Sequence, residues 1–385
     1  MAHSSEMFSS VTGPSKLDTS CRVLWIAPNL NHYKKRLLDH LATDPKVELH
    51  VMVGRMETQQ GHRKDVADSH FQTIETKATK KNFAWHWQAY TLLTREILKG
   101  QPNTVLFPLE KKLLPLLIWV KVLKFFRGFR LISYNHPVMP MRLWKKQGFD
   151  RWVTKTLFKL YDGIVFYTQT AKEWSVDNHL ITYKRAYFAN NTLDTDNIAR
   201  HGAETFDEAS SIRFLFIGRL IVSKRVDLAI EYLKAIQKNQ PSATLTIIGD
   251  GPLAETVKHA ASNNPGITWL GALTEERDIA PHMKTAHVVF IPGETGLSVV
   301  HAFAYGKPYL TLDLPSLTHG PELSYLESGK NGLLLSGEKT VDCDRILALL
   351  GDKRAYGAMC KAAREKAEYL SIENWRRQMV DAIAQ

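Results

Sequence analysis

Two basic residues follow a short apolar stretch in the second half of the sequence, where IRFLFIG at 212–218 runs into RLIVSK. Arg219 and Lys224 lie in the turn between this predicted strand and a predicted helix. A guanidinium forks onto phosphate oxygens and an ammonium adds a point charge, so the pair suits a diphosphate. A structural salt bridge that involves either residue is the alternative interpretation.

A second candidate anion site lies at 292–297, where PGETGL precedes a short helical stretch. Glycines and free backbone N–H groups at a helix N-terminus bind anions through their geometry and through the helix dipole. The turn GDGP, which contains Gly251, also lets a ligand approach the backbone, although many such turns are only turns. Both features fit the same diphosphate.

Two polar side chains interrupt the otherwise apolar or small residues that follow this turn. Glu294 lies in the turn and His301 lies in the predicted helix. The two residues either belong to an active site, or His301 is a packed helix residue on one face with Leu297 and Ala304.

Short apolar runs alternate with amphipathic stretches along most of the chain, which is typical of strands and helices in parallel sheets. Because the series occurs twice, we expect an α/β protein with two Rossmann-like, doubly wound domains that face each other across a cleft. Ligands of such sheets bind beyond the carboxyl ends of the strands. The predicted strands cover 22–28, 47–53, 104–108, 129–136 and 162–168 in the first series, and 212–218, 243–250, 267–271, 286–292 and 308–313 in the second.

A chain of 385 residues is too long for one ordinary core and fits two domains. Residues 1–20 are polar and lack an apolar segment, which predicts a flexible tail and no signal peptide. We place the first domain at 21–200 and the second at 201–367, because the sequence between them turns polar and acidic. The last segment, 368–385, has the spacing of an amphipathic helix.

The composition, with 44% hydrophobic and 23% charged residues, is that of an ordinary globular protein. Cys21, Cys343 and Cys360 are odd in number and share no CxxC spacing, so neither a disulfide framework nor a metal site is predicted. We therefore expect a cytoplasmic protein. The longest apolar run, at 113–120, is too short to span a bilayer.

The net charge of +11 is concentrated between residues 110 and 146, where nine Lys or Arg face the single acid Glu110. Tryptophans and phenylalanines are interleaved with these charges, as in interfacial helices, and each basic residue near anionic lipid contributes about 1 kcal/mol. A solvated helix face is the alternative, and no nucleic-acid-binding signature is present. We expect a peripheral contact with the inner face of the plasma membrane through Lys121, Lys124, Arg127 and Arg130.

The order and spacing of these residues resemble the second domain of GT-B glycosyltransferases of the retaining, family 4 type. A weaker resemblance in the first half rests on SYNHP at 133–137. In the GT-B fold that the resemblance implies, the last helix returns to the N-terminal domain. The segments that carry it are FIGRLIVSK (216–224), IIGDGP (247–252), ITWLGALTEE (267–276), AHVVFIPGETGLSVVHAFAYGKP (286–308) and ESGKNGLLL (327–335).

The resemblance implies a metal-independent hexosyltransferase that takes a sugar from a UDP- or GDP-linked donor, with no cofactor, and retains its anomeric configuration. Arg219 and Lys224 would neutralise the departing diphosphate, which is electrostatic stabilisation of developing charge. His136 would position the sugar from the opposite domain. The implied donor-binding residues also include Gly218, Gly251, Gly293, Thr295, Gly296 and Leu297.

The sequence departs from the family pattern of two glutamates eight positions apart. Alignment on HAFAYGKP puts Gly293 at the first glutamate and His301 at the second, with Glu294 one residue out of register. A histidine can still bond a ribose hydroxyl, and Glu294 reaches the sugar if the turn has shifted. Glu322 either supplies the missing carboxylate or is a surface acid.

After the first predicted strand, Asn31, His32 and Tyr33 replace the small residues that are usual in the family, and we expect them on the acceptor side. We expect a lipid-linked or surface-polysaccharide acceptor, in lipopolysaccharide, capsule or exopolysaccharide synthesis. Two alternatives stay open at this point. One is a sugar-nucleotide epimerase of the same fold, and the other is a non-catalytic nucleotide-sugar-binding protein, since the first glutamate is missing.

Overall fold

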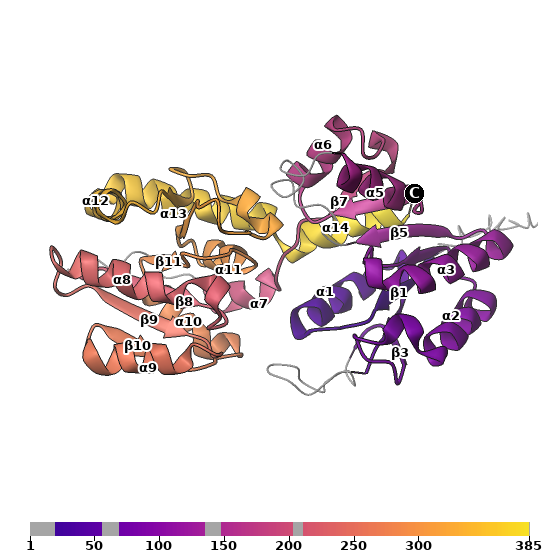
Figure 1. Cartoon of the computed structure of the whole chain (residues 1–385), viewed down its shortest axis with the longest axis horizontal. Helices are drawn as coiled ribbons and strands as arrows, with labels where there is room; N and C mark the ends of the chain where they lie inside the picture. The colour runs from indigo at the N-terminus through magenta and orange to yellow at the C-terminus, as the bar shows by residue number, and fades with distance from the viewer. Residues whose placement is uncertain (1–19, 56–68, 135–147, 203–210, 385) are drawn as a thin grey trace, which may run out of the picture.

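The computed structural model describes residues 20–55, 69–134, 148–202 and 211–384 of the chain. Figure 1 shows two α/β domains that lie side by side, each with helices packed against a central sheet. Every strand pair in both sheets is parallel. The prediction of two doubly wound α/β domains is therefore confirmed.

The first domain is built on seven strands in the order β3-β2-β1-β4-β5-β6-β7. The chain order reverses between β1 and β4, and such a switch point is where doubly wound sheets bind ligands. The strands are β1 (Cys21–Ala27), β2 (Val47–Val53), β3 (Gln72–Glu75), β4 (Thr104–Leu106), β5 (Arg130–Tyr134), β6 (Gly163–Phe166) and β7 (Ala186–Phe188).

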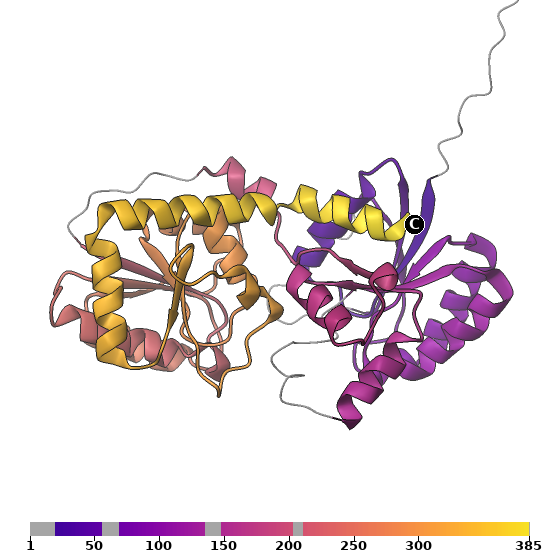
Figure 2. The ribbon, with the colours of Figure 1, turned by 90° about the horizontal axis from the view of Figure 1, so that it is seen from above.

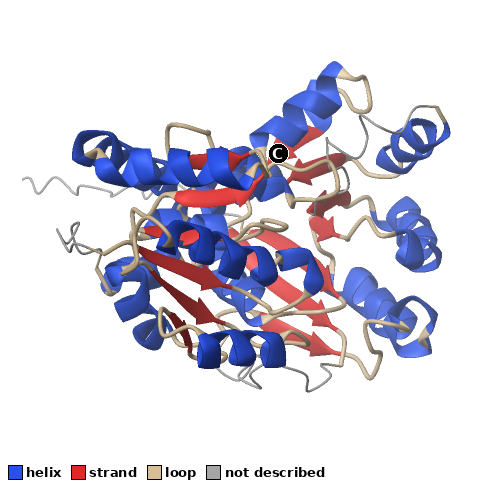
Figure 3. Ribbon diagram, turned by 60° about the vertical axis from the view of Figure 1, so that its left-hand side comes forward, coloured by secondary structure: helices blue, strands red, loops and turns tan. Residues whose placement is uncertain are grey.

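Helices cover both faces of this sheet, as the view in Figure 3 shows. Helix α3 illustrates how the sequence sets them: Pro115 lies in its first turn, and Gly128 ends it with a left-handed φ of +69°. The elements are α1 (His32–Ala42), η1 (Phe83–Trp85), α2 (Trp87–Gly100), η2 (Lys111–Leu113), α3 (Leu114–Arg127), α5 (Phe149–Phe158), α6 (Gln169–Asp177) and η3 (Tyr183–Arg185).

The second domain has six strands in the order β10-β9-β8-β11-β12-β13, with its switch point between β8 and β11. Its strands are β8 (Arg213–Ile217), β9 (Thr244–Ile248), β10 (Ile267–Trp269), β11 (Val288–Phe290), β12 (Tyr309–Leu312) and β13 (Gly332–Leu335). Its helical elements are α7 (Thr195–Arg200), η4 (Val222–Lys224), α8 (Val226–Gln237), α9 (Ala254–Asn263), α10 (Glu276–Thr285), α11 (Ser298–Ala304), η5 (Pro321–Tyr325), α12 (Lys339–Gly351) and α13 (Lys353–Tyr369).

Helix α7 precedes the predicted domain boundary, yet it packs in the second domain. Its Ile198 is buried in the same apolar cluster as Phe214 and Phe290, and α7 lies against α10 and α11. The first residues of the second domain's core therefore come before the acidic stretch that marked the boundary in the sequence.

Three strands were not predicted from the sequence: β3, β7 and β13. Each lies at an edge of its sheet and has only three or four residues. Edge strands are buried on fewer sides, so they need no continuous apolar run, and β3 reads QTIE; β13 differs, since it reads GLLL and is short rather than polar.

The last helix, α14 (Ile372–Ile383), packs on the first domain, and Figure 2 shows α13 and α14 passing along one side of both domains. Trp375 is buried there, and its indole N–H donates to the Tyr134 hydroxyl at 2.8 Å. At the other end of α14, the Thr104 hydroxyl and the Arg130 guanidinium donate to the Ile383 carbonyl at 3.3 and 3.1 Å. They satisfy a carbonyl that has no partner within the helix.

We expect Trp375→Ala to destabilise the first domain by about 3–5 kcal/mol, because it empties a site that is 1% exposed. Trp375→Phe keeps most of the packing and loses the bond to Tyr134, at a cost of about 1 kcal/mol. Urea unfolding followed by circular dichroism measures both, with the exposed Trp152→Ala as the control. Equal urea midpoints for Trp375→Ala and Trp152→Ala would contradict the role of Trp375 in packing α14 on the first domain.

Candidate functional site

Two strand-end loops of the second domain cross at the carboxyl edge of β8 and β11. The Glu294 N–H donates to the Ser223 carbonyl at 2.8 Å, and the Gly293 N–H donates to the Lys224 carbonyl at 3.2 Å. A Cβ atom at position 293 would lie 2.2 Å from the Ser223 oxygen, so only glycine fits. The residue aligned with the family's first glutamate therefore cannot carry a side chain here, and Glu294 is the next position that can.

The crossing fixes Lys224. Its ammonium donates to the Glu294 carbonyl oxygen at 2.5 Å, next to Gly296. Burial lowers the pKa of Lys224, while the charges of Glu294 and Glu322 act in the opposite direction. Arg219 is exposed at the same edge and interacts electrostatically with Lys224. The structure thus brings the two predicted phosphate-binding cations together.

The turn that contains Gly251 packs against the end of β8. Gly251 has a φ of +152°, and a Cβ atom there would lie 2.6 Å from the Leu220 oxygen. The close contact between the two strand ends therefore explains why position 251 is a glycine. Gly218 differs: no atom lies within 4 Å of the position that a Cβ would occupy, so its backbone faces open space.

Thr295 lies in the turn between Glu294 and α11. Its N–H donates to His319 Nδ1 at 3.1 Å, and His319 Nε2 donates to the Leu312 carbonyl at 3.0 Å, which fixes the tautomer of the ring. Burial lowers the pKa of His319. The Thr295 hydroxyl is buried and has no hydrogen-bond partner among the described residues. Such an orphaned buried group is suited to a bound ligand.

The helix that follows, α11, spans seven residues and begins after Leu297. Because the helix is short, its dipole contributes little to the predicted anion site at its N-terminus. The cations Arg219 and Lys224 are the main source of positive charge at this edge.

His301 is buried in α11 and engaged with a residue that the sequence analysis did not single out. Its Nε2 lies 3.0 Å from a carboxylate oxygen of Glu276 in α10, and the Tyr305 hydroxyl donates to the same oxygen at 2.6 Å. Burial raises the pKa of Glu276, but the hydrogen bonds and the charge of His301 outweigh it and leave that pKa below its usual value. The contact favours the packed-residue interpretation of His301. Glu276 ends the sequence LTEE at the start of α10, but no spacing in the sequence connects it with His301.

Glu322 lies where the two domains meet, in η5. It is buried, and Asn191 of the segment after β7 donates its amide N–H to Glu322 at 2.5 Å. Burial raises the pKa of Glu322, and the bond from Asn191 and the charge of Lys224 oppose that change. Because it is buried, Glu322 is not the surface acid that the alternative interpretation assumed.

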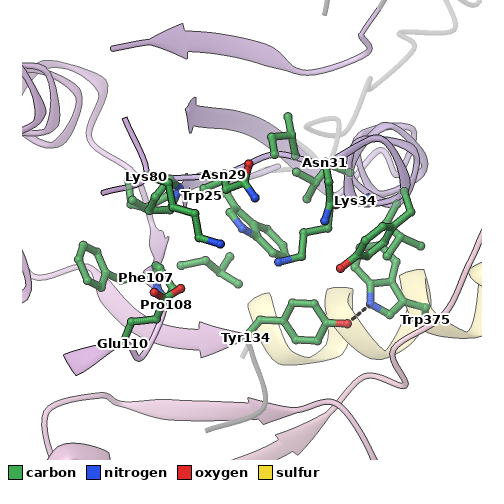
Figure 4. A pocket seen from close by; sticks show the side chains of 18 residues that line it. Trp25, Asn29, Asn31, Lys34, Lys80, Phe107, Pro108, Glu110, Tyr134 and Trp375 are labelled. Carbon is green, nitrogen blue, oxygen red and sulfur yellow. Dashed lines mark hydrogen bonds between the residues drawn. The ribbon is translucent and has the colours of Figure 1, made fainter. Parts of the chain in front are cut away.

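The first domain has a cavity of about 260 Å³ at the carboxyl ends of β1 and β4, which Figure 4 shows from close by. Asn31 and Tyr33 line it. Asn31 also caps α1, since its side chain accepts from the Lys34 N–H at 3.3 Å. Other lining residues are Trp25, Asn29, Lys34, Lys80, Phe107, Glu110, Tyr134 and Trp375.

Two predicted site residues cannot be placed. His136 and the side chain of His32 lie outside the described part of the structure. Across the described ranges, no group of three or more His, Cys, Asp or Glu is arranged to hold a metal ion. No helix in those ranges has the length and apolar character needed to cross a membrane.

The predicted lipid-facing residues separate into two groups. Lys124 donates to Asp162 at 2.7 Å and to the Phe129 carbonyl, and Arg130 caps α14. Both side chains are therefore engaged in contacts within the protein. We therefore correct the predicted set: it retains Lys121 and the exposed Arg127, which also donates to the Leu98 carbonyl at 3.0 Å.

Residues 211–352 match the family model of glycosyl transferases group 1. The matched residues all lie in the second domain and make up less than half of the chain. A GDP-mannose-dependent alpha-(1-6)-phosphatidylinositol dimannoside mannosyltransferase of Mycobacterium tuberculosis is 31% identical over 112 residues, which are 28% of this chain and 29% of that protein. The match thus spans less than a third of that relative.

Solved structures extend the likeness to the whole chain. A glycosyltransferase from Rickettsia africae aligns with a TM-score of 0.72 and 13% identity, over 94% of this chain and 98% of its own. The Anabaena protein HepE, solved in complex with UDP, aligns with a TM-score of 0.67 and 13% identity, over 94% and 99%. At this identity the likeness concerns the fold, and the chain has the predicted GT-B architecture.

The lowered pKa of Glu276 predicts that the stability of the second domain depends on pH. Its folded pKa lies below the usual 4.5, so its bonds to His301 and Tyr305 contribute stability above pH 4.5 that is lost as the pH falls through the folded pKa. We expect Glu276→Gln to lower the free energy of unfolding by about 1–3 kcal/mol at pH 7 and by less below pH 4.

Urea titrations at a series of pH values measure this difference. His201 also acts on Glu276, so His201→Ala is included. The exposed Glu255→Gln serves as the control and is expected to change little at any pH. An effect of Glu276→Gln that does not change with pH would contradict the ionised state of Glu276.

Proposed function

We propose that this protein is a retaining glycosyltransferase that moves a hexose from a UDP- or GDP-linked sugar to a lipid-linked or surface-polysaccharide acceptor, without a metal ion. The observation that carries the proposal is the contact of Lys224 with the turn 293–297, close to the exposed cation Arg219, in a domain that matches the group 1 family model. Two similar proteins support the two donor classes, since one is GDP-mannose-dependent and the other was solved with UDP.

In the proposed reaction, the bond between the sugar and the diphosphate breaks and negative charge develops on the phosphate oxygens. Lys224 is held by a backbone carbonyl, and no carboxylate lies within ion-pair distance of it among the described residues, so its charge is available to the leaving group. Partial burial strengthens this interaction, because the local dielectric is lower than in water. Arg219 supplies a second, exposed cation.

Two carboxylates are proposed to contact the donor. Glu294 is half-buried and interacts electrostatically with Lys224 and His319, which puts its charge near the diphosphate position. Glu322 lies between the domains with a raised pKa, and a perturbed carboxyl at such a junction is a functional-site candidate. We propose that Glu294 binds sugar hydroxyls and that Glu322 orients the sugar from the side of Asn191.

A thermal-shift panel of UDP-, GDP-, ADP- and CDP-linked sugars tests donor binding, because specific binding stabilises the folded state by mass action. We expect one UDP or GDP sugar to raise the melting temperature. In a transfer assay with that donor, Lys224→Ala is expected to reduce kcat by about 10²–10³-fold. Lys238→Ala, on the exposed end of α8, is the matched control.

Three outcomes would point away from a transferase. Release of free nucleotide with an altered sugar and no acceptor would indicate an epimerase. Tight donor binding without turnover would indicate a binding protein. No stabilisation by any of the four donor classes would contradict the proposal as a whole.

We also propose that α3 contacts an anionic membrane surface. Leu114, Ile118, Val122 and Phe125 form an exposed apolar stripe on α3, and Phe125 is 87% exposed. Trp85, in η1, which packs against α3, is 75% exposed. A stripe of this kind bordered by Lys121 and Arg127 has the character of an interfacial helix.

We expect Ile118→Ser with Phe125→Ser to reduce binding to vesicles that contain anionic lipid, measured by cosedimentation. Lys121→Glu and Arg127→Glu are each expected to weaken it about fivefold or more, because each cation contributes about 1 kcal/mol. Val341→Ser removes an apolar side chain that is 54% exposed on α12 and serves as the control. Unchanged vesicle binding in the α3 variants would contradict the proposed membrane contact.

A further inference from the structure

The cavity of the first domain has the size and position of a site for one sugar unit. Its volume of about 260 Å³ lies just below the range for drug-sized ligands, roughly 300–1,000 Å³, which suits a smaller ligand. It opens at the switch point of the first sheet, and its lining comes from that domain and from Trp375 of α14. No residue of the second sheet's strand-end loops lines it.

One wall of the cavity is aromatic and held in place. The Tyr134 ring lies 5.7 Å from the Trp25 ring at an interplanar angle of 79° and 6.1 Å from the Trp375 ring. The Trp375 indole N–H donates to the Tyr134 hydroxyl, as the dashed line in Figure 4 shows. This bond holds the Tyr134 and Trp375 rings in place relative to each other. A rigid aromatic surface suits the apolar face of a sugar ring.

Two lysines from different elements also line the cavity. Lys34 comes from the first turn of α1 and Lys80 from the loop after β3, and Figure 4 shows both side chains extending toward the middle of the cavity. In the part of the chain that the structure describes, neither ammonium makes an ion pair or a hydrogen bond. The nearby acid, Glu110, is already paired with Lys112 at 2.7 Å.

The charge of this cavity is therefore incompletely balanced. Burial lowers the pKa of Lys34, the Lys80 charge lowers it further, and Glu110 acts in the opposite direction. A desolvated cation without a paired anion is unfavourable, and a bound anion removes that cost. The positive end of the eleven-residue helix α1 adds to the same potential, since its cap Asn31 also lines the cavity.

We infer that this cavity binds an acceptor sugar that carries a phosphate or carboxylate group, with Lys34 and Lys80 on the anionic group and Trp25 and Tyr134 along the ring. The inference rests on the proposed function and names the chemical class of its acceptor. The cavity is separate from the donor cations Arg219 and Lys224, which lie at the edge of the other sheet. The anion is therefore assigned to the acceptor and not to the donor diphosphate.

Glucose, glucose 6-phosphate and glucuronate serve as probes on the full chain, with affinity measured by isothermal titration. We expect glucose 6-phosphate or glucuronate to bind at least tenfold more tightly than glucose, with an affinity that falls as salt increases. Lys34→Met and Lys80→Met are each expected to weaken that binding about tenfold. Lys81→Met changes the exposed neighbour outside the cavity and is the matched control.

A second variant guards against a folding defect. Lys34→Arg keeps the charge, and binding of the anionic probe within a few-fold of wild type would show that charge is what matters. Equal loss in Lys34→Arg and Lys34→Met would overturn the anionic assignment, and so would equal affinity for glucose and glucose 6-phosphate.

UDP and GDP form the second arm of the test and separate the two sources of phosphate. We expect their affinity to be unchanged in Lys34→Met and Lys80→Met and reduced in Lys224→Ala. If the cavity variants lose nucleotide binding, the two lysines belong to the donor diphosphate and the inference is wrong. If no nucleotide or nucleotide sugar binds but the anionic sugar still binds at the lysines, the cavity is an anionic-sugar site and the proposed transferase function, with its acceptor role for this cavity, fails.

Discussion

The backbone pairing of Gly293 and Glu294 with Ser223 and Lys224 is the contact on which the candidate donor site depends. Two loops from neighbouring strands, β8 and β11, approach so closely that a side chain at position 293 has no space. The same approach brings the Lys224 ammonium to the Glu294 carbonyl. Because a backbone bond sets its position, Lys224 has little freedom to move when charge develops near it, which is the condition for electrostatic preorganisation.

A second set of contacts holds the two domains in register. The Tyr325 hydroxyl of η5 donates to the Tyr167 carbonyl at 2.9 Å, beyond the end of β6, and Glu322 of the same turn accepts from Asn191. Helix α14 also packs on the first domain, where Trp375 is buried and donates to Tyr134. These contacts involve backbone carbonyls and buried side chains, so Glu322 is positioned relative to both sheets at once.

The sequence predicted the central strands because buried parallel strands read as apolar runs, as in IRFLFIG and AHVVFIP. It did not predict β3 or β7, whose place at a sheet edge relaxes that requirement. It also predicted the convergence of strand-end loops, since the carboxyl ends of parallel strands share an edge. The partner of His301 was not predictable, because the contact with Glu276 joins α10 and α11 across 25 residues and leaves no periodic signal.

The basic residues show most clearly where sequence reasoning stops. Charge and spacing grouped Lys124 and Arg130 with Lys121 and Arg127. A charge pattern does not reveal whether a side chain points to solvent or to the protein. Lys124 pairs with Asp162, which directly precedes β6, and that residue comes within reach only once β5 and β6 lie side by side.

The direction of a lysine, and what it meets, separates structural cations from those available to a ligand. Lys124 is satisfied by the Asp162 carboxylate, whereas Lys224 has a backbone carbonyl and Lys34 has no carboxylate in contact among the described residues. Burial lowers the pKa of both Lys224 and Lys34. A partly desolvated cation without a paired acid is retained at a cost in stability, and in each of the two domains that cost falls on the edge of the sheet where the fold binds ligands.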